Sequence, residues 1–437
     1  MKHGFRKAFL TLYLPYDEAM ESEVYAVIDI KSFYASCECA ARGLDPFSTP
    51  LVVADKSRSV NSIVMSATPY LKARYRIPNV CRIQDLPDIE EMIYATPRMS
   101  YYVEMSANIV SLFLDFVAEE DLHVYSIDES FLRLTPYLKM NECDAFGFVT
   151  KIQEAIKARF GLIATAGLGP NMFLAKACLD NEGKKKPPYR AYWGYEDVQT
   201  KLWKVAPITK IWGIAHGIGS HLHRIGIRSM EALAKASPAL IEKEFGVVGL
   251  DLQMLANGID HTDITHKYVP KETSFSQGQV LMRDYMPAEA ALVLKEIVDE
   301  LCIRLRAANA QTKVVSLFVG YSSMGGGGGL HHQCALNVAA DDNDILNDLV
   351  QQLYARYIEP RPIRNLVVSF GKLSRYDAPR QQSIFEREEE LQERRCLRLA
   401  MDKISERFGR NAILRASALL KHSTIIDRHG LIGGHRA

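Results

Sequence analysis

Three carboxylates in the first third of the chain are spaced as a metal site would require. Asp29 closes the apolar run 24–28, and Asp128 and Glu129 stand side by side between the strand-like runs 123–127 and 131–134. Carboxylates at buried strand ends are costly to desolvate, and a divalent ion is the usual compensation where phosphates are handled. The alternative is that the acidic pair is the solvated tip of a hairpin.

Two aromatic residues follow the first acid in a segment, 32–38, that has the pattern of a helix start. Phe33 and Tyr34 lie about one helical turn beyond Asp29. A ring packed there against a nucleotide's sugar would leave too little room for a 2'-hydroxyl and would favour deoxyribose. The alternative for Phe33 is an anchor in the core.

The elements around these residues predict an α+β fold. Strands are expected at 24–30, 51–54, 123–127, 131–134 and 162–166, and helices at 32–38, 70–76, 106–116, 146–160 and 171–179. This order favours a mostly antiparallel sheet with helices on one face. Neighbouring strands would then bring the three acids together.

The second half of the chain contains two further patterns. Glycines interrupt the helical segment 208–236 at 213, 217, 219 and 226, a spacing that resembles a helix-hairpin-helix, whose backbone N–H groups bind phosphate. The alternative is a glycine-rich turn between packed helices, and Ala215 stands where the hairpin usually has a second glycine. Region 271–373 has the order β-α-β-β-α-β, and its five glycines at 325–329 predict a mobile loop. A charged segment, 387–407, predicts a solvated helix without a core of its own.

Composition limits the class of protein. The chain has 437 residues, 48% of them hydrophobic, which predicts two to four domains, and its net charge of +1 confines nucleic-acid contacts to local patches. Eight cysteines without C-x-x-C offer neither zinc spacing nor a disulfide framework, and residues 1–22 lack the apolar stretch of a signal peptide or membrane span. We expect a reduced, cytoplasmic protein with no membrane contact.

The motif D-x-x-x-F-Y-A-S at 29–36, followed by Y-S-I-D-E-S at 125–130, resembles a Y-family DNA polymerase, and specifically its UmuC branch. The likeness covers residues from about 24 to 376 and implies a multidomain right-hand fold. The implied parts are an N-terminal arm and first part of the palm (1–35), fingers (36–96), the rest of the palm (97–190), a helical thumb with the helix-hairpin-helix (191–265), a βαββαβ little finger (271–376) and a tail (377–437).

The resemblance implies error-prone translesion synthesis in the SOS response, on damaged primer–template DNA with deoxynucleoside triphosphates as substrates. It also implies that Asp29, Asp128 and Glu129, with the backbone carbonyl of Ile30, hold two Mg²⁺ ions. Two such ions, about 4 Å apart, would serve nucleotidyl transfer onto the primer 3'-hydroxyl. Lys31 stands where many relatives carry an acid, and we expect its side chain to point away from the metals.

The resemblance also implies a set of nucleotide-binding residues. Tyr34 takes the position of the steric gate against ribonucleotides, Phe33 supports it beneath the sugar, and Tyr70 matches the fingers tyrosine. The fingers cation aligns with Ala73, which leaves Lys72 and Arg74 as alternatives. The palm lysine follows a segment that is longer than usual, and we assign it to Lys184, with Lys185 and Lys186 as alternatives.

Residues 381–385, Q-Q-S-I-F, resemble the Q-x-S-L-F peptide that docks bacterial polymerases on the sliding clamp. Gln381 would fix register while Ile384 and Phe385 enter an apolar pocket, and Ser383 belongs to the same clamp-binding set. The alternative is a linker with two buried apolar residues. The rival function is a non-catalytic, clamp-tethered DNA-binding protein, which would not need three acids and Tyr34. Whether an accessory subunit takes part stays open.

The little finger would grip the DNA backbone with one face. Its acids gather at Asp341, Asp342, Asp344 and Asp348, so the DNA would meet the opposite face. The candidate cations of that face are Lys271, Arg304, Arg306 and Lys313.

Overall fold

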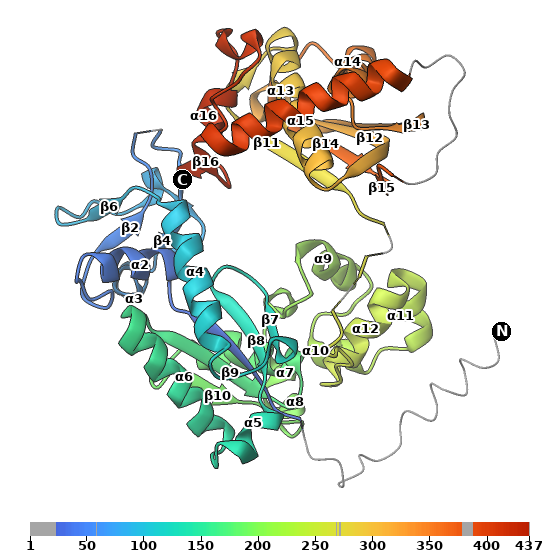
Figure 1. Cartoon of the computed structure of the whole chain (residues 1–437). Coiled ribbons are helices and arrows are strands. Elements are labelled where there is room, and N and C mark those ends of the chain that lie inside the picture. The colour runs from blue at the N-terminus through green and yellow to red at the C-terminus, as the bar shows by residue number, and fades with distance from the viewer. Residues whose placement is uncertain (1–22, 58, 268, 271, 378–387, 437) are drawn as a thin grey trace. The chain divides into compact units, whose positions relative to one another are not determined.

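The computed structural model describes residues 23–436 except 58, 268, 271 and 378–387 (Figure 1). The chain divides into two compact units, 1–267 and 268–437. Within the described residues no helix is both long and apolar enough to cross a membrane, and the cysteines are free thiols.

A five-stranded sheet forms the centre of the first unit. Its strands, in the order β10-β9-β1-β8-β7, are antiparallel except for the parallel pair β9 and β10. They are β1 (Tyr25–Ile30), β7 (Leu122–Val124), β8 (Glu129–Arg133), β9 (Ala164–Gly169) and β10 (Arg190–Tyr192). The α+β class predicted from the sequence is confirmed, and both acid-bearing strands lie at the middle of this sheet.

Helices cover both faces of this sheet, so the expectation of a single covered face was wrong. Alternate residues of β1, among them Ala26 and Ile28, pack in one core with α2 (Phe33–Ala41), α4 (Met99–Phe113) and α6 (Ala145–Phe160). Tyr25 and Val27 face the other way and pack against α7 (Met172–Cys178). Because strand residues alternate between faces, Asp29 lies on the α7 side.

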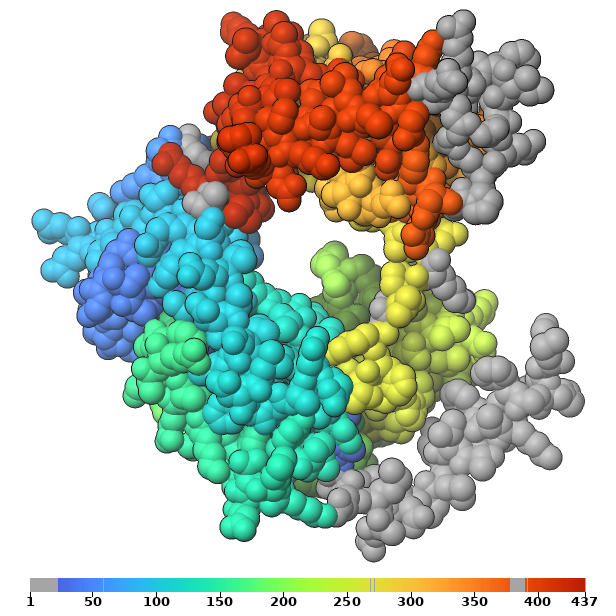
Figure 2. Space-filling view, viewed as in Figure 1, coloured from blue at the N-terminus to red at the C-terminus, as the bar shows by residue number. Residues whose placement is uncertain are grey.

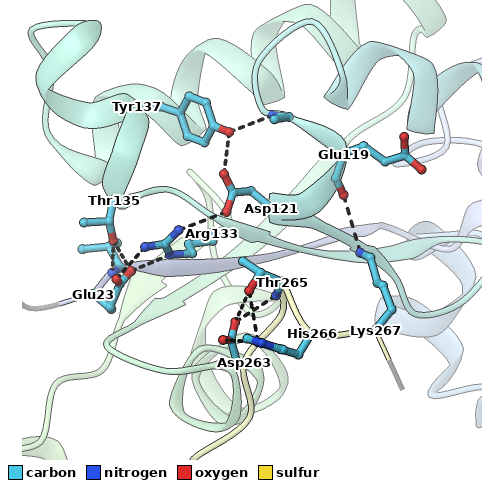
Figure 3. Close-up of polar contacts among 12 residues, drawn as sticks. Glu23, Glu119, Asp121, Arg133, Thr135, Tyr137, Asp263, Thr265, His266 and Lys267 are labelled. Atoms are coloured by element: carbon cyan, nitrogen blue, oxygen red, sulfur yellow. Dashed lines mark hydrogen bonds and ion pairs between the residues drawn. The ribbon is translucent and has the colours of Figure 1, made fainter. Parts of the chain in front are cut away.

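A polar network holds the end of the sheet remote from Asp29 (Figure 3). Arg133 of β8 donates two hydrogen bonds to Glu23, at 2.9 and 2.8 Å, and one to Asp121 at 3.3 Å. Asp121, in the 3₁₀ turn η2 (Glu119–Asp121), accepts a further bond from Tyr137 of α5 (Thr135–Met140), at 2.6 Å. Lys267 donates to the carbonyl of Leu122 at 2.8 Å, which ties the end of the unit to β7.

A small lobe follows α2. It contains a three-stranded sheet of order β4-β2-β6, a two-stranded ribbon of β3 and β5, and one helix. Their bounds are β2 (Leu51–Val53), β3 (Ile63–Val64), β4 (Ser66–Ala67), α3 (Pro69–Tyr75), β5 (Cys81–Arg82), η1 (Ile83–Asp85) and β6 (Ile93–Ala95). The strand and helix expected at 51–54 and 70–76 are both present.

The last part of the first unit is helical. After α7 the chain forms the π-helical turn η3 (Leu179–Gly183), then short helices and 3₁₀ turns: α8 (Asp197–Thr200), η4 (Leu202–Lys204), η5 (Ile208–Lys210), α9 (His216–Arg224), α10 (Met230–Ala234), α11 (Pro238–Phe245) and α12 (Val247–Ala256). The hairpin-like segment is η5, a turn with Gly213 at φ 89°, and α9. A Cβ on Gly219 would lie 2.4 Å from a methyl carbon of Thr209, so the close approach of η5 to α9 requires glycine.

The second unit has the predicted βαββαβ order. Its four main strands form a sheet of order β11-β14-β12-β13, with α13 and α14 packed on it. The bounds are β11 (Phe275–Tyr285), α13 (Pro287–Ala307), β12 (Ala310–Tyr321), η6 (Ser323–Gly325), β13 (Gly329–Ala340), α14 (Asn343–Tyr357), β14 (Ile363–Gly371) and β15 (Ser374–Arg375). The five glycines lie in a closed hairpin turn, in which Gly327 N–H donates to the carbonyl of Ser322 and Tyr321 N–H donates to that of Gly328; the mobility expected of this loop stays a prediction.

Residues 388–436 belong to the second unit and spread over its surface (Figure 2). They form α15 (Glu388–Phe408), η7 (Ala416–Leu419), α16 (Ile425–His429) and the ribbon of β16 (Leu431–Ile432) and β17 (His435–Arg436). The predicted helix at 387–407 is present, and none of its described side chains is buried. Ion pairs join it to the rest of the unit: Arg306–Asp402 at 2.6 Å, Arg395–Asp341 at 2.7 Å and Arg398–Asp344 at 3.3 Å. Beyond the helix, Arg415 pairs with Asp299 at 2.9 Å.

These ion pairs provide partners for acidic residues of the second unit. Asp341 and Asp344 meet arginines of the tail, so a DNA backbone would not meet this face. Arg306 was wrongly placed among the candidate DNA contacts, because its side chain is only 2% exposed and is paired with Asp402. Arg304 and Lys313 are exposed, and Lys271 lies outside the described residues.

Candidate active site

Strand pairing brings the three acids together. Asp29 of β1 is directly opposite Glu129 of β8, and the N–H of Ile30 donates to the carbonyl of Asp128 at 3.0 Å. Glu129 is the first residue of its strand and is only 7% exposed. The solvated hairpin tip is therefore excluded for Glu129. Ser126 Oγ donates to Asp128 Oδ1 at 2.8 Å and orients that carboxylate.

Two lysines balance the charge of these acids. Lys184 Nζ lies 3.0 Å from Asp29 Oδ2, and Lys176 Nζ donates to Glu129 Oε2 at 2.9 Å. Asp180 joins the two lysines, at 3.0 Å from Lys184 and 3.1 Å from Lys176. Carboxylates and ammonium groups therefore alternate across the site, in the order Asp29, Lys184, Asp180, Lys176, Glu129.

Burial makes the two strand acids harder to ionise. It raises the pKa of Asp29 to about 6, although the charge of Lys184 acts in the opposite direction. It also raises the pKa of Glu129, despite the hydrogen bond from Lys176. A cation that approaches either carboxylate therefore stabilises its ionised form.

The donor set fits a hard divalent cation. All three side chains offer carboxylate oxygens, which Mg²⁺ prefers. Glu129 Oε1 is buried and accepts no hydrogen bond among the described residues, although Lys176 Nζ lies 2.7 Å away. Within the described part of the chain, no three His, Cys, Asp or Glu side chains are grouped closely enough to hold a metal ion as they stand. A metal would therefore require the acids and lysines to rearrange.

The π-helical turn explains the position of Lys184. It accommodates the long segment after α7, and the N–H of Lys184 donates to the carbonyl of Leu179 at 3.1 Å. A Cβ on Gly183 would lie 2.3 Å from the carbonyl oxygen of Ala166, so the turn can approach β9 only with glycine there. The other two lysines that the sequence left open, 185 and 186, are exposed.

The structure also distinguishes Lys72 from Arg74, the two candidates for the fingers cation. Lys72 is half-buried, and burial lowers its pKa, while the charges of Asp29 and Asp128 act to raise it. Its ammonium therefore lies within electrostatic reach of the acids. Arg74 is exposed, and its guanidinium lies 5.9 Å from the ring centroid of Tyr75. Tyr70 is partly buried and packs against the core of the small lobe.

The two aromatic residues after Asp29 are placed differently. Phe33 is 2% exposed and belongs to the core, as the structural alternative held. Tyr34 is only partly buried, and its pKa is raised first by burial and then by the charge of Asp128, so it lies near the acids. The Nζ of Lys31 donates to the carbonyl of Lys184 at 2.9 Å and lies 4.5 Å from the ring centroid of Tyr189. Burial lowers the pKa of Lys31 and the charge of Asp29 acts to raise it, so the expectation that this side chain points away from the metals stays a prediction.

Asp180 is a site residue that was not predicted. Its signal was the spacing Lys176, Asp180, Lys184, since residues four apart lie on one face of a helix. The residues predicted to bind the clamp, Gln381, Ser383, Ile384 and Phe385, lie outside the described residues.

Comparisons with known proteins identify the relatives of this chain. The model of the impB/mucB/samB family matches residues 28–180, and that of the impB/mucB/samB family C-terminal domain matches 272–384. UvrX of Bacillus subtilis strain 168, whose name assigns it to UV-damage repair, is 35% identical over 94% of this chain and 97% of its own length. The DNA polymerase IV 2 proteins of Bacillus subtilis strain 168 and Halalkalibacterium halodurans are 29% and 30% identical, over 95% and 94% of this chain and 99% of each relative.

A solved structure matches the fold. The Y-family DNA polymerase chimera Dbh-Dpo4(243-245)-Dbh has a TM-score of 0.65 and 21% identity, over 80% of this chain and 99% of the chimera. The predicted right-hand fold with its βαββαβ little finger is confirmed.

Proposed function

This chain belongs to the impB/mucB/samB family of Y-family DNA polymerases, and we propose that it is a DNA-directed DNA polymerase that performs error-prone translesion synthesis. The observation that carries this proposal is the direct pairing of Asp29 with Glu129, beside Asp128, with Lys184 and Tyr34 at the same site. A non-catalytic DNA-binding protein tethered to the clamp would need none of these groups.

The acids are proposed to hold two Mg²⁺ ions, with the carbonyl of Ile30 as a further ligand. When bound, the ions supply activation of the primer 3'-oxygen and stabilisation of the pyrophosphate leaving group. Asp29, Asp128 and Glu129 are suited to this role because they lie on paired strand ends with fixed backbones.

The lysines are proposed to exchange partners when substrate binds. Lys184 would leave Asp29 for an oxygen of the triphosphate, which frees the carboxylate as the nucleotide arrives. Asp180 would keep Lys184 at the site during this exchange, because it contacts the same ammonium group. Lys72 is the proposed fingers cation, with Tyr70 beside the phosphates. Arg74 is a weaker candidate, because it is exposed.

Tyr34 is the proposed steric gate. It is the second residue of α2, five residues after Asp29, and lies close enough to Asp128 for that charge to affect its pKa. Phe33 would support the gate from within the core rather than touch the nucleotide.

The remaining parts would hold DNA and the clamp. The palm, fingers, thumb, little finger and tail are proposed at the limits expected from the sequence, with the hairpin-like segment presenting backbone N–H groups to a DNA phosphate. Docking on the sliding clamp through 381–385, a role in the SOS response, membership of the UmuC branch, a cytoplasmic location and the use of an accessory subunit are all parts of this proposal.

Primer extension with Mg²⁺ on undamaged and abasic templates tests the proposal. We expect extension of both primers, stimulated by the sliding clamp, and loss of the stimulation alone when Ile384 and Phe385 are replaced by Ala. Binding to primer–template DNA without extension would favour the non-catalytic alternative.

A further inference from the structure

Tyr34 forms a cluster with two other aromatic rings. Its ring centroid lies 4.9 Å from that of Tyr102 and 5.5 Å from that of Phe33, with interplanar angles of 54° and 51°. Phe33 and Tyr102 are buried, whereas Tyr34 is partly exposed. The ring of Tyr34 therefore rests on two rings that have no freedom to move away.

Tyr102 is fixed by a buried carboxylate. Its hydroxyl donates to Glu38 Oε1 at 2.7 Å, and the Glu38 side chain is fully buried. Arg98 donates to both oxygens of this carboxylate, at 2.9 and 3.0 Å, and Arg42 pairs with Oε2. Glu38 is thereby held in one orientation by three donor residues: Tyr102 on α4, Arg98 just before α4 and Arg42 just after α2.

The network joins the helix of the gate to the helix that supports it. Tyr34 and Glu38 are four residues apart on α2, so their side chains share a face. Tyr102 lies on α4, and Arg98 is the residue just before this helix. Since Glu38 on α2 bonds to both of them, the Glu38 network joins the gate ring's helix to the ring that supports it.

Burying a carboxylate between two helices costs desolvation free energy. Burial alone would raise the pKa of Glu38, but the hydrogen bonds from Arg98, Arg42 and Tyr102 outweigh it, and the pKa lies below its ordinary value. Glu38 is thus ionised at neutral pH. An apolar pair of similar volume would often stabilise such an interface more. What the ionic network provides in exchange is a single, directional position for the Tyr102 ring.

We propose that Tyr102, fixed by Glu38 and Arg98, is a positioning residue that sets the orientation of Tyr34 and through it the selection of deoxyribose over ribose. This inference rests on the proposed function, in which Tyr34 is the steric gate. A gate excludes a hydroxyl only if it cannot retreat, and Tyr34 has Tyr102 directly behind it.

The test measures kcat/KM for a deoxynucleotide and for the matching ribonucleotide with five variants of the full chain, one of which is Glu38→Gln. Tyr34→Ala establishes whether Tyr34 is the gate at all. Tyr102→Leu removes the supporting ring and Tyr102→Phe removes only its hydrogen bond to Glu38. Phe148→Leu is the control, because Phe148 is buried in the same core but its ring partners are Phe116 and Tyr137.

We expect Tyr102→Leu to lower the deoxyribose-to-ribose selectivity on the order of tenfold, mainly by improving use of the ribonucleotide, as loss of a shape constraint in a pocket does. Tyr102→Phe should lower it less, and Phe148→Leu should leave the ratio unchanged. If Tyr102→Leu does not fold, Tyr102→Phe and Glu38→Gln decide, each with an expected loss of about threefold.

The outcomes separate the inference from its premise. If Tyr34→Ala leaves the selectivity unchanged, the proposed gate itself is wrong. If Tyr34→Ala lowers the selectivity but the Tyr102 and Glu38 variants match Phe148→Leu, the gate stands and the positioning role is overturned.

Discussion

Replacing Lys184 by Met should weaken the use of deoxynucleoside triphosphates. A charge-assisted hydrogen bond contributes roughly 1.5–3 kcal/mol, which corresponds to a loss of about 10- to 150-fold. The lower end applies here, because Lys184 must first leave Asp29, which lies 3.0 Å from its ammonium, and it stays in contact with Asp180 at the same distance. We therefore expect kcat/KM for the nucleotide to fall about tenfold to thirtyfold.

Single-nucleotide insertion on a primed template, with the nucleotide titrated at fixed Mg²⁺, measures this effect. Lys185→Met and Lys186→Met are matched controls, since both lysines are exposed and belong to the same triplet. Each should change kcat/KM by less than about twofold, as surface substitutions do. A loss at Lys185 or Lys186 as large as that at Lys184, or no loss at Lys184, would refute the assignment.

Three further predictions follow from the same contacts. Lys72→Met should lower nucleotide kcat/KM about tenfold and Arg74→Met less than twofold, and the reverse order would assign the role to Arg74. Glu38→Gln should reduce the free energy of unfolding in urea by about 1–3 kcal/mol at pH 7. Because the folded pKa of Glu38 lies below its ordinary 4.5, this deficit is complete above pH 4.5 and should shrink as the pH falls through the folded pKa; a constant deficit would contradict it. Arg306→Met should destabilise the second unit by about 3–5 kcal/mol, because it leaves Asp402 without its buried partner, and an unchanged melting temperature would show that the tail is not docked.

The sequence predicted much of the fold because local patterns specify it. The apolar run before Asp29 has the length and continuity of a buried strand, and the second unit followed from alternating strand and helix periods. Adjacent strands then brought Asp29 to Glu129. The helix start of α4 was missed: it begins at Met99, well before the expected 106, where its first turns pack into the core.

Contacts between distant segments could not be predicted in this way. The choice of Lys72 over Arg74 depends on which side of α3 faces the acids, and the choice of Lys184 depends on the π-helical turn before it. Docking of the tail depends on pairs such as Arg306–Asp402, whose partners are far apart in the sequence. The pairing of Tyr102 with Glu38 likewise has no local pattern.

The central claim is that the paired acids carry out metal-dependent nucleotidyl transfer. Its most direct test compares primer extension by wild type, Asp128→Asn and Asp115→Asn across a Mg²⁺ titration. Asp115 is a matched control, because it is exposed and lies just beyond the end of α4. We predict that extension by wild type and Asp115→Asn requires Mg²⁺, and that Asp128→Asn loses extension at every Mg²⁺ concentration while still binding primer–template DNA. Undiminished extension by Asp128→Asn would contradict the account.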